Sequence, residues 1–396
     1  MNNTTFIPRS AQTTLKRLAS SFPIIGITGP RQAGKTTLAR HYFPDKPYRS
    51  LEDPDQLEFA QSDPRGFLGQ FKHGAVLDEV QRCPDLFSYL QGVVDESKQM
   101  RVFVLTGSQQ FGFRAQMVQT LAGRIGLISL LPFSADELTL SGHMPDSLDK
   151  LLYQGFYPTI YDRNIQPNDW YSSYVQTYIE RDVHQLIKIK DLNSFRTFLR
   201  VCAGRASQTV NLSSIGNDCG ISYNTVKEWL SVLEASYIVF QVPPHFNNFS
   251  KRLIKSPKLY FYDTGLLIWL LGIKQADQLS IHAMRGAIFE NFVAGELLKH
   301  QFAQGEPSNL YSWRDNNGLE IDLIIDHGNT LIPVEIKAGQ TINKDFFKNL
   351  KKWRALAGDK AQKSYLVYGG NEDQDRSDIS VLSWRSLARL MTHQLN

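Results

Sequence analysis

The chain has 396 residues, of which 42% are hydrophobic and 21% are charged, and its formal net charge is +4 at pH 7. This length exceeds one ordinary hydrophobic core and predicts roughly two to four domains, and the composition excludes an intrinsically disordered protein. The mildly basic charge is far below the excess that would by itself indicate nucleic-acid binding, so charge leaves the partner open.

The cysteines and the apolar runs indicate a cytoplasmic protein without a membrane partner. Cys83, Cys202 and Cys219 are odd in number and too far apart for a zinc knuckle or a disulfide framework. Residues 1–22 lack the apolar core of a signal peptide. The most apolar run, residues 265–273, is about half as long as a membrane-spanning helix.

The first strong pattern is a series of apolar strands separated by helical stretches. Residues 24–28 predict a strand, and a helix is predicted from about Lys35. Further buried strands are predicted within GAVLDEV (74–80) and RVFVLTGS (101–108), so the segment indicates a parallel α/β sheet. Ser134 is placed to cap a helix that closes this first domain near residue 140.

The turn after the first strand matches a phosphate-binding loop. Residues 29–36 read GPRQAGKT and satisfy G-x-x-x-x-G-K-[ST] in the strand-to-helix context that the motif requires. Backbone N–H groups would surround the β-phosphate, Lys35 would reach the β and γ oxygens, and Thr36 would bind Mg²⁺. A simple glycine-rich turn is the structural alternative. The expected ATP-binding residues are Gly29, Pro30, Arg31, Gln32, Ala33, Gly34, Lys35, Thr36, Thr37 and Ser108.

Acidic residues at the end of the second strand supply the other half of this site. Asp78 is expected to bind Mg²⁺, and Glu79 is expected to polarise the attacking water. Ser108, at the end of the third strand, is expected beside the γ-phosphate, although capping a following helix explains it equally well. Arg124 either stabilises developing charge, in its own subunit or across an oligomer interface, or forms a surface salt bridge.

The middle of the chain predicts two further units. Residues 143–202 carry aromatic and aliphatic residues at helical spacing and predict a helical linker region. Residues 203–262 predict a helix capped by Ser213, a turn at Gly220, a second helix capped near Ser222 and a β-branched run. This order of elements is typical of a winged helix-turn-helix.

Few basic residues accompany the predicted winged helix. Lys227 lies in its second helix beside Glu228 and Trp229, which is a weak surface for phosphate contacts. Four more basic residues follow and supply either a basic wing or a solvated loop: Lys251, Arg252, Lys255 and Lys258. DNA and a regulatory protein are therefore both candidate partners.

The C-terminal domain, residues 263–396, contains two apolar strands with charges at alternate positions. Glu320 and Asp322 share one face of the first strand, and Glu335 and Lys337 share one face of the second. A two-residue turn would place Glu320 opposite Glu335 with all four charges on one face, although longer loops are an alternative. A hairpin with one wet face would explain the same pattern.

A divalent cation is the second explanation of these charges. Carboxylates that face one another repel unless a positive charge lies between them. Lys337 would orient a nucleophilic water or steady a phosphoryl oxygen. Glu290, on a helix predicted over residues 286–300, would complete the pocket. The expected ligands of this second Mg²⁺ or Mn²⁺ are Glu290, Asp322 and Glu335, with Glu335 and Lys337 in catalytic roles.

Long stretches of the chain resemble two known families. GPRQAGKTTL, LDEVQ, LTGSQ and LAGR resemble the first domain of AAA+-type P-loop ATPases of the AAA_14 type. YIERDV, RGAIFENFV, WRDNNGLEIDLII and PVEIKAG resemble the DUF4143 domain paired with that ATPase, which is similar to the PD-(D/E)xK nuclease superfamily. The resemblance implies that the charged set of that superfamily is complete here, at Glu290, Asp322 and the triplet 335–337.

Together these observations predict a multidomain α/β protein. Its expected parts are a P-loop ATPase domain with a parallel sheet (1–142), a helical linker region (143–202), a winged helix-turn-helix (203–262) and a restriction-endonuclease-like α/β domain (263–396). We expect a Mg²⁺-dependent ATPase whose nucleotide state controls the C-terminal half. Two alternatives stay open: an ATP-gated, metal-dependent DNA endonuclease, and a non-nucleolytic switch that binds DNA or a protein.

Overall fold

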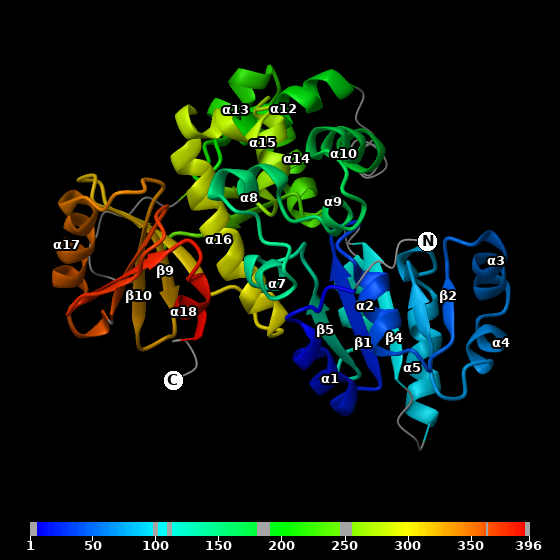
Figure 1. The fold of residues 1–396 in the computed structure, drawn as a ribbon. Coiled ribbons are helices and arrows are strands. Elements are labelled where there is room, and N and C mark those ends of the chain that lie inside the picture. Colours follow the sequence, from blue (N-terminus) through cyan, green and yellow to red (C-terminus); the bar gives the residue numbers. More distant parts are fainter. Residues whose placement is uncertain are drawn as a thin grey trace.

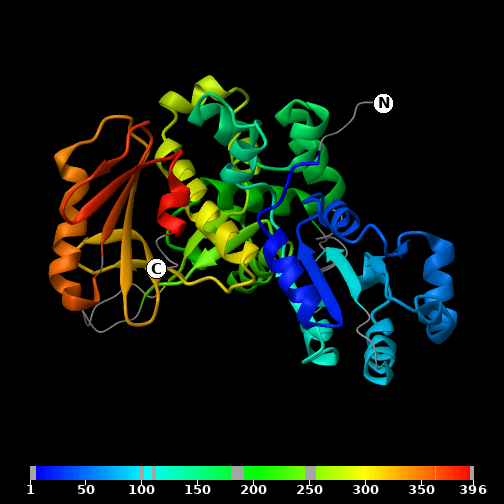
Figure 2. The same cartoon turned by 60° about the horizontal axis from the view of Figure 1, so that its bottom comes forward.

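The computed structural model describes residues 6–97, 102–108, 113–179, 191–245, 256–361 and 363–392. It places two β-sheets at opposite ends of the molecule, with the helices of the middle region between and above them (Figure 1). Figure 2 shows the same separation from a second direction. Within the described part of the chain, no helix has the length and apolar character needed to cross a membrane.

The N-terminal sheet has five strands in the order β2-β3-β4-β1-β5, all paired in parallel. Strand β1 lies between β4 and β5 and is buried along its whole length, because its side chains alternate between two apolar clusters. Such a strand is typical of a parallel sheet covered on both faces. The strands are β1 (Ile24–Gly29), β2 (Tyr48–Ser50), β3 (Val76–Asp78), β4 (Phe103–Ser108) and β5 (Ile125–Ser129).

Helices cover this sheet, and their limits agree with local signals. Ser134 and Glu137 form a capping box at the start of α7, which confirms the predicted helix start. The elements are α1 (Gln12–Ser21), α2 (Lys35–Tyr42), α3 (Pro54–Ser62), α4 (Pro64–Gly69), η1 (Val80–Arg82), α5 (Leu86–Glu96), α6 (Phe113–Thr120) and α7 (Ala135–Leu140).

The middle region is helical and ends in a two-stranded antiparallel sheet. Its elements are α8 (Leu148–Gln154), α9 (Pro158–Arg163), α10 (Pro167–Tyr174), the π-helix η2 (Val175–Ile179), α12 (Leu192–Gly204), α13 (Leu212–Cys219), α14 (Tyr223–Ala235), β6 (Val239–Val242) and β7 (Lys258–Phe261). Gly220, at φ +67°, ends α13, and Ser222 caps α14, as predicted. The predicted cap at Ser213 is wrong, because Asn211 accepts the hydrogen bond from Ser214 N.

The C-terminal region contains a six-stranded mixed sheet in the order β12-β13-β11-β10-β9-β8. Its strands are β8 (Leu310–Arg314), β9 (Glu320–Asp326), β10 (Leu331–Lys337), β11 (Ser364–Tyr368), β12 (Gln374–Asp375) and β13 (Ile379–Ser383). Its helices are α15 (Thr264–Leu270), η3 (Ala276–Ile281), α16 (Arg285–Ala303), η4 (Lys344–Phe347), α17 (Lys348–Ala357), η5 (Gly358–Lys360) and α18 (Leu387–Thr392).

The predicted register of the β9–β10 hairpin is wrong by two residues. Asp326 pairs with Leu331, so the loop has four residues (327–330) and not two. The pairing runs to Leu323 and Val334, and it brings Asp322, not Glu320, level with Glu335. A four-residue loop was compatible with the sequence, because only the turn and not the strand pattern sets the hairpin length.

One apolar cluster joins the middle region to the C-terminal region. It extends from Phe133 to Met391 and includes most of the buried face of α16. Asp263 illustrates this continuity, because it caps α15 and also accepts hydrogen bonds from Phe156 N and the Tyr171 hydroxyl. The residues before and after residue 262 therefore share one hydrophobic core.

Candidate functional site

The phosphate-binding loop lies between β1 and α2, at the carboxyl end of the parallel sheet. A β-carbon on Gly29 would lie 2.0 Å from the carbonyl oxygen of Leu130, so only glycine fits there. Gly34, at φ +90°, directly precedes the first residue of α2. Gln32 adopts φ +60° although it is not a glycine. The loop thus has the glycines, the curvature and the helix start that the sequence predicts.

Lys35 is folded back into this loop. Its ammonium donates hydrogen bonds to the carbonyl oxygens of Gly29 (3.1 Å) and Pro30 (2.7 Å), and the side chain is buried. Burial lowers the Lys35 pKa to about 8, although the nearby carboxylates of Glu79 and Asp78 oppose this shift. A phosphate group in the loop would offer this ammonium stronger, charged acceptors than two carbonyls.

Asp78 is the centre of a buried hydroxyl cluster. The Thr36 hydroxyl donates to both of its carboxylate oxygens, at 3.0 and 3.1 Å, and the Tyr48 hydroxyl donates to Oδ2 at 2.8 Å. Thr106, on β4, also donates to Asp78. The structure thus brings together Thr36 and Asp78, the two residues predicted to hold Mg²⁺.

The donor set fits a magnesium ion that is shared with a nucleotide. Among the described residues, no group of three or more His, Cys, Asp or Glu side chains is arranged to hold a metal ion. Mg²⁺ in phosphate-transfer sites needs only one or two protein oxygens, because water and phosphate supply the other ligands. Thr36 and Asp78 would hold it, and the ion would screen the phosphate charge.

Glu79 follows Asp78 at the carboxyl end of β3 and has a strained backbone. Its φ of +53° lies in the left-handed region, which is unusual for a residue with a side chain. Gln81 donates a hydrogen bond to Glu79 Oε2, and the Ser108 hydroxyl donates to the same oxygen at 3.3 Å. The predicted water-activating carboxylate and the predicted γ-phosphate residue are therefore in direct contact.

The middle region covers the outer side of the phosphate loop. Gln32 Nε2 donates to the Tyr178 hydroxyl at 2.8 Å, and Thr159 donates to Gln32 Oε1 at 3.2 Å. The Arg31 guanidinium lies 5.6 Å from the centre of the Tyr178 ring. Thr37, the last of the predicted loop residues, is exposed in the first turn of α2.

A small pocket separates the loop from the middle region. On the middle side, Ser236 ends α14, and its hydroxyl oxygen is buried without a hydrogen-bond partner among the described residues. Tyr237 follows at φ +56°, and its hydroxyl lies 3.2 Å from Thr28 Oγ1 on β1. The pocket is lined by Gly29, Pro30, Arg31, Ser108, Tyr174, Tyr178, Ile179, Ser236 and Ile238.

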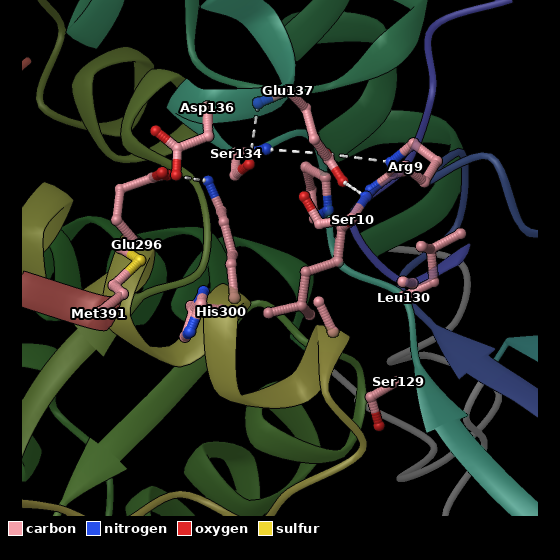
Figure 3. A pocket seen from close by; sticks show the side chains of 15 residues that line it. Arg9, Ser10, Ser129, Leu130, Ser134, Asp136, Glu137, Glu296, His300 and Met391 are labelled. Carbon is pink, nitrogen blue, oxygen red and sulfur yellow. Dashed lines mark hydrogen bonds and ion pairs between the residues drawn. The ribbon is translucent and has the colours of Figure 1, made fainter. Parts of the chain in front are cut away.

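Arg9 supports the loop from the other side, and the sequence did not point to it. Its guanidinium donates to the carbonyl oxygens of Ala33 (2.9 Å) and Leu131 (2.6 Å), and it forms a buried ion pair with Glu137 at 3.0 Å. Figure 3 shows Arg9 and Glu137 in contact with each other at a pocket that Glu296, on α16, also lines. Tyr48 was missed too, because neither residue lies in a recognisable motif.

Arg124 does not belong to the phosphate site of its own chain. Its neighbour Ile125 pairs with Ile24, which begins β1, whereas the phosphate loop follows the other end of that strand. Arg124 instead makes two hydrogen bonds to Asp95, at 2.6 and 2.8 Å. The prediction of a charge-stabilising role within its own subunit is therefore wrong, and the surface salt bridge is the alternative that the structure has.

The second predicted site lies in the C-terminal sheet, and a lysine from β7 enters it. Lys258 Nζ lies 2.7 Å from Glu320, 3.0 Å from Glu290 and 4.0 Å from Asp322. Tyr260 donates a hydrogen bond to the same Glu290 oxygen at 2.7 Å. Of the predicted basic wing, Lys251, Arg252 and Lys255 lie outside the described residues, whereas Lys258 is buried among carboxylates.

Glu335 and Lys337 complete this cluster of charged side chains. The cluster of Lys258, Glu290, Glu320, Asp322, Glu335 and Lys337 is called the acidic pocket below. Lys337 Nζ lies 2.7 Å from Glu335 Oε1 and 3.6 Å from Asp322 Oδ2, and Ile336 N donates to Asp322 Oδ2 at 2.7 Å. Burial raises the pKa of Glu335 to about 8 and that of Glu290 to about 7. The three predicted ligands lie in one cluster with Lys258 and Lys337, and Lys258 occupies the space beside two of them. Among the described residues they do not form a three-ligand metal site.

Comparison with known proteins finds three family models along the chain. Family models match an AAA domain at residues 21–139, a domain of unknown function (DUF8612) at residues 145–277 and a domain of unknown function (DUF4143) at residues 285–387. The uncharacterized proteins Rv2008c of Mycobacterium tuberculosis and Mb2031c of Mycobacterium bovis are each 30% identical over 376 residues, which is 94% of this chain and 82% of theirs.

Two solved structures are among those that are similar to parts of this chain. The Walker-type ATPase paby2304 of Pyrococcus abyssi has a TM-score of 0.43 and 12% identity, over 67% of this chain and 96% of that one. The Thermotoga maritima RuvB Holliday junction branch migration motor has a TM-score of 0.31 and 18% identity, over 59% of this chain and 89% of that one. Similarity at this level assigns no function.

The parallel sheet, the phosphate loop and the AAA domain match define a nucleotide-binding P-loop ATPase of the AAA class. The residues that identify it are Lys35 in the loop and the Thr36–Asp78 pair beside it. The chain belongs to the family represented by the two mycobacterial proteins, and it joins this ATPase domain to a C-terminal DUF4143 domain.

Proposed function

We propose that the protein hydrolyses ATP with Mg²⁺ and that the state of the nucleotide is passed to the middle region and the C-terminal half. The observation that carries the proposal is the convergence of Lys35, Thr36, Asp78 and Glu79 at one edge of the parallel sheet. These residues come from the start of α2 and the end of β3, which is the arrangement that phosphoryl transfer to water requires.

Each of these side chains has a distinct role in the proposed reaction. Lys35 leaves the carbonyl oxygens of Gly29 and Pro30 and binds the β- and γ-phosphate oxygens. Glu79 accepts a hydrogen bond from the attacking water, and Ser108 holds the Glu79 carboxylate in place through the contact at 3.3 Å. Bound Mg²⁺ neutralises phosphate charge, and Thr36 and Asp78 are the residues that would hold it.

Contacts across the pocket support the coupling to the middle region. Gln32, within the loop, is hydrogen-bonded to Tyr178 of the middle region. Thr28, just before the loop on β1, is hydrogen-bonded to Tyr237. A γ-phosphate in this loop would lie against the pocket that the Ser236 hydroxyl lines. Binding and loss of the γ-phosphate therefore change the surroundings of η2 and of the end of α14.

Nucleotide binding by a Lys35→Ala variant tests the central part of the proposal. The variant loses charge-assisted hydrogen bonds worth about 1.5–3 kcal/mol each, so the Kd for ATP should rise by at least about tenfold. A Lys72→Ala variant is the matched control, because Lys72 is an exposed lysine of the same domain. Titration calorimetry with MgATP measures both, and equal affinity of the two variants would contradict the proposal.

We also propose that α12, α13, α14, β6 and β7 act as a winged helix that binds DNA or a protein. The turn at Gly220 between two capped helices, followed by an antiparallel pair of strands, supports this assignment. Tyr223 is 52% exposed at the start of α14 and would form part of the contact surface. DNA binding that weakens steeply with salt would support a DNA contact, whereas no salt dependence would indicate a protein partner.

A further inference from the structure

The acidic pocket between α16 and the β9–β10 hairpin contains a positive charge of the protein itself, the ammonium of Lys258. The ammonium of Lys258 lies within 3.0 Å of oxygens from Glu290 and Glu320, which come from a helix and a strand far apart in sequence. Lys258 is 5% exposed although its side chain carries a charge. A buried lysine is tolerated where its charge is paired and its N–H groups are bonded, and both conditions are met here.

We propose that Lys258 acts in place of a metal ion: its ammonium occupies the cation position of the acidic pocket and excludes divalent cations from it. The pocket is then closed by the middle region, because β7 is part of that region. This inference is independent of ATP hydrolysis, since it concerns residues remote in sequence from the phosphate loop.

The ammonium lies beside the carboxylate oxygens that a divalent ion in this pocket would bind. A Mg²⁺ or Mn²⁺ ion binds carboxylate oxygens at about 2.0–2.2 Å. Lys258 Nζ lies 3.0 Å from the Glu290 oxygen and 4.0 Å from the nearest Asp322 oxygen. An ion bridging Glu290 and Asp322 would therefore be close to the ammonium, and like charges at such separations repel strongly when both are buried.

A carboxylate oxygen of Glu335 without a hydrogen-bond partner indicates that the ligand excluded by Lys258 is a cation. Glu335 Oε1 is paired with Lys337, but Oε2 is buried and has no hydrogen-bond partner among the described residues. Glu335 is only 3% exposed. A buried carboxylate oxygen without a donor is unfavourable, and a cation held between Asp322 and Glu335 would satisfy it once Lys258 had left.

Lys258 is held in place by the strand that carries it and by contacts at the edge of the C-terminal sheet. β7 pairs with β6, and Asn291 on α16 hydrogen-bonds both the N–H and the carbonyl of Phe261 at the end of β7. After β6, His245 N donates to Ser312 O at 2.8 Å, and the His245 ring lies 2.9 Å from Asp326. These contacts fix the position of β7 and therefore of the Lys258 backbone.

A Lys258→Met variant of the full chain tests the proposal, because methionine keeps much of the side-chain volume and removes the charge. Binding of Mn²⁺ is measured without nucleotide by electron paramagnetic resonance of the free ion. The variant should bind one more Mn²⁺ than the parent, because the parent binds none in this pocket. The added Asp322→Asn substitution should remove that binding.

Lys299→Met is the matched control. Lys299 is 6% exposed and is paired with Glu296 at 2.7 Å, so it is as buried and as closely paired as Lys258, but in a different place. This variant should gain no Mn²⁺ site. A folded Lys258→Met variant that binds no more Mn²⁺ than the parent would refute the proposal.

The parent chain provides a test that does not depend on folding of the variant. If the parent binds Mn²⁺ and Asp322→Asn abolishes that binding, then Lys258 does not exclude divalent ions and the proposal is wrong. If Asp322→Asn leaves Mn²⁺ binding by the parent unchanged, the pocket is closed as proposed. Neither result depends on ATP, so failure of this inference is distinguishable from failure of the proposed ATPase activity.

Discussion

Replacing Arg9 by methionine should destabilise the ATPase domain much more than the same replacement at a surface arginine. The Arg9 guanidinium is 6% exposed, and it binds two carbonyl oxygens and the Glu137 carboxylate. Removing one partner of a buried ion pair costs about 3–5 kcal/mol. Glu137 keeps hydrogen bonds from Ser10 N at 2.6 Å and Ser134 N at 3.0 Å, so we expect a loss near the lower limit, about 3 kcal/mol.

Differential scanning calorimetry is the appropriate assay, because all six tryptophans follow residue 169 and none lies within the N-terminal domain whose unfolding is measured. For a domain of this size, about 3 kcal/mol corresponds to a Tm lowered by on the order of 10 °C. Arg124→Met is the control, since it truncates an arginine whose ion pair with Asp95 is partly exposed, and it should melt with the parent. An Arg9→Met domain that melts within about 2 °C of the parent would refute the reasoning.

Three further predictions concern the phosphate site. Glu79→Gln should still bind MgATP but should hydrolyse it about 10²- to 10⁴-fold more slowly in a phosphate-release assay, because it cannot accept the proton of the attacking water; unchanged turnover would remove Glu79 from the mechanism. Burial lowers the Lys35 pKa to about 8, so the positive charge of Lys35 is lost as pH rises through that value. The affinity for ATP should therefore decline above about pH 8 by up to tenfold per pH unit. A Lys35→Met variant should bind ATP weakly and should show no such decline. Trp170 stacks on Tyr174 with ring centres 4.8 Å apart, next to Tyr178, so ATP should change tryptophan fluorescence in the parent. This fluorescence change should be smaller in a Tyr178→Phe variant, whose affinity for ATP should shift less than about fivefold. An undiminished change would show that the Gln32–Tyr178 contact does not transmit the signal.

The phosphate site was predictable from the sequence because its chemistry is local. A glycine pattern between a strand and a helix fixes where Lys35 and Thr36 lie, and a strand that ends in Asp78 joins them at the same edge of a parallel sheet. Arg9 and Tyr48 follow no such rule. Each reaches the site from an element whose position depends on packing across the domain, and neither lies in a motif.

The acidic pocket shows where the sequence was insufficient. Alternation along the two strands correctly predicts which charges share a face, because the side-chain period of a strand is two. It does not predict the four-residue loop that sets Asp322 level with Glu335. Nor does it predict Lys258, because a lysine after a polar segment is usually solvent-exposed, and only the packing of β7 against α16 buries it.

Helix α16 contacts both the acidic pocket and the segment before α7. At about 1.5 Å per residue its 19 residues span about 28 Å. Near one end Glu290 meets Lys258, and nine residues later Lys299 donates to the carbonyl oxygen of Phe133, just before α7 of the ATPase domain. No proline interrupts it, so one continuous helix runs from the Glu290–Lys258 ion pair to the contact with Phe133.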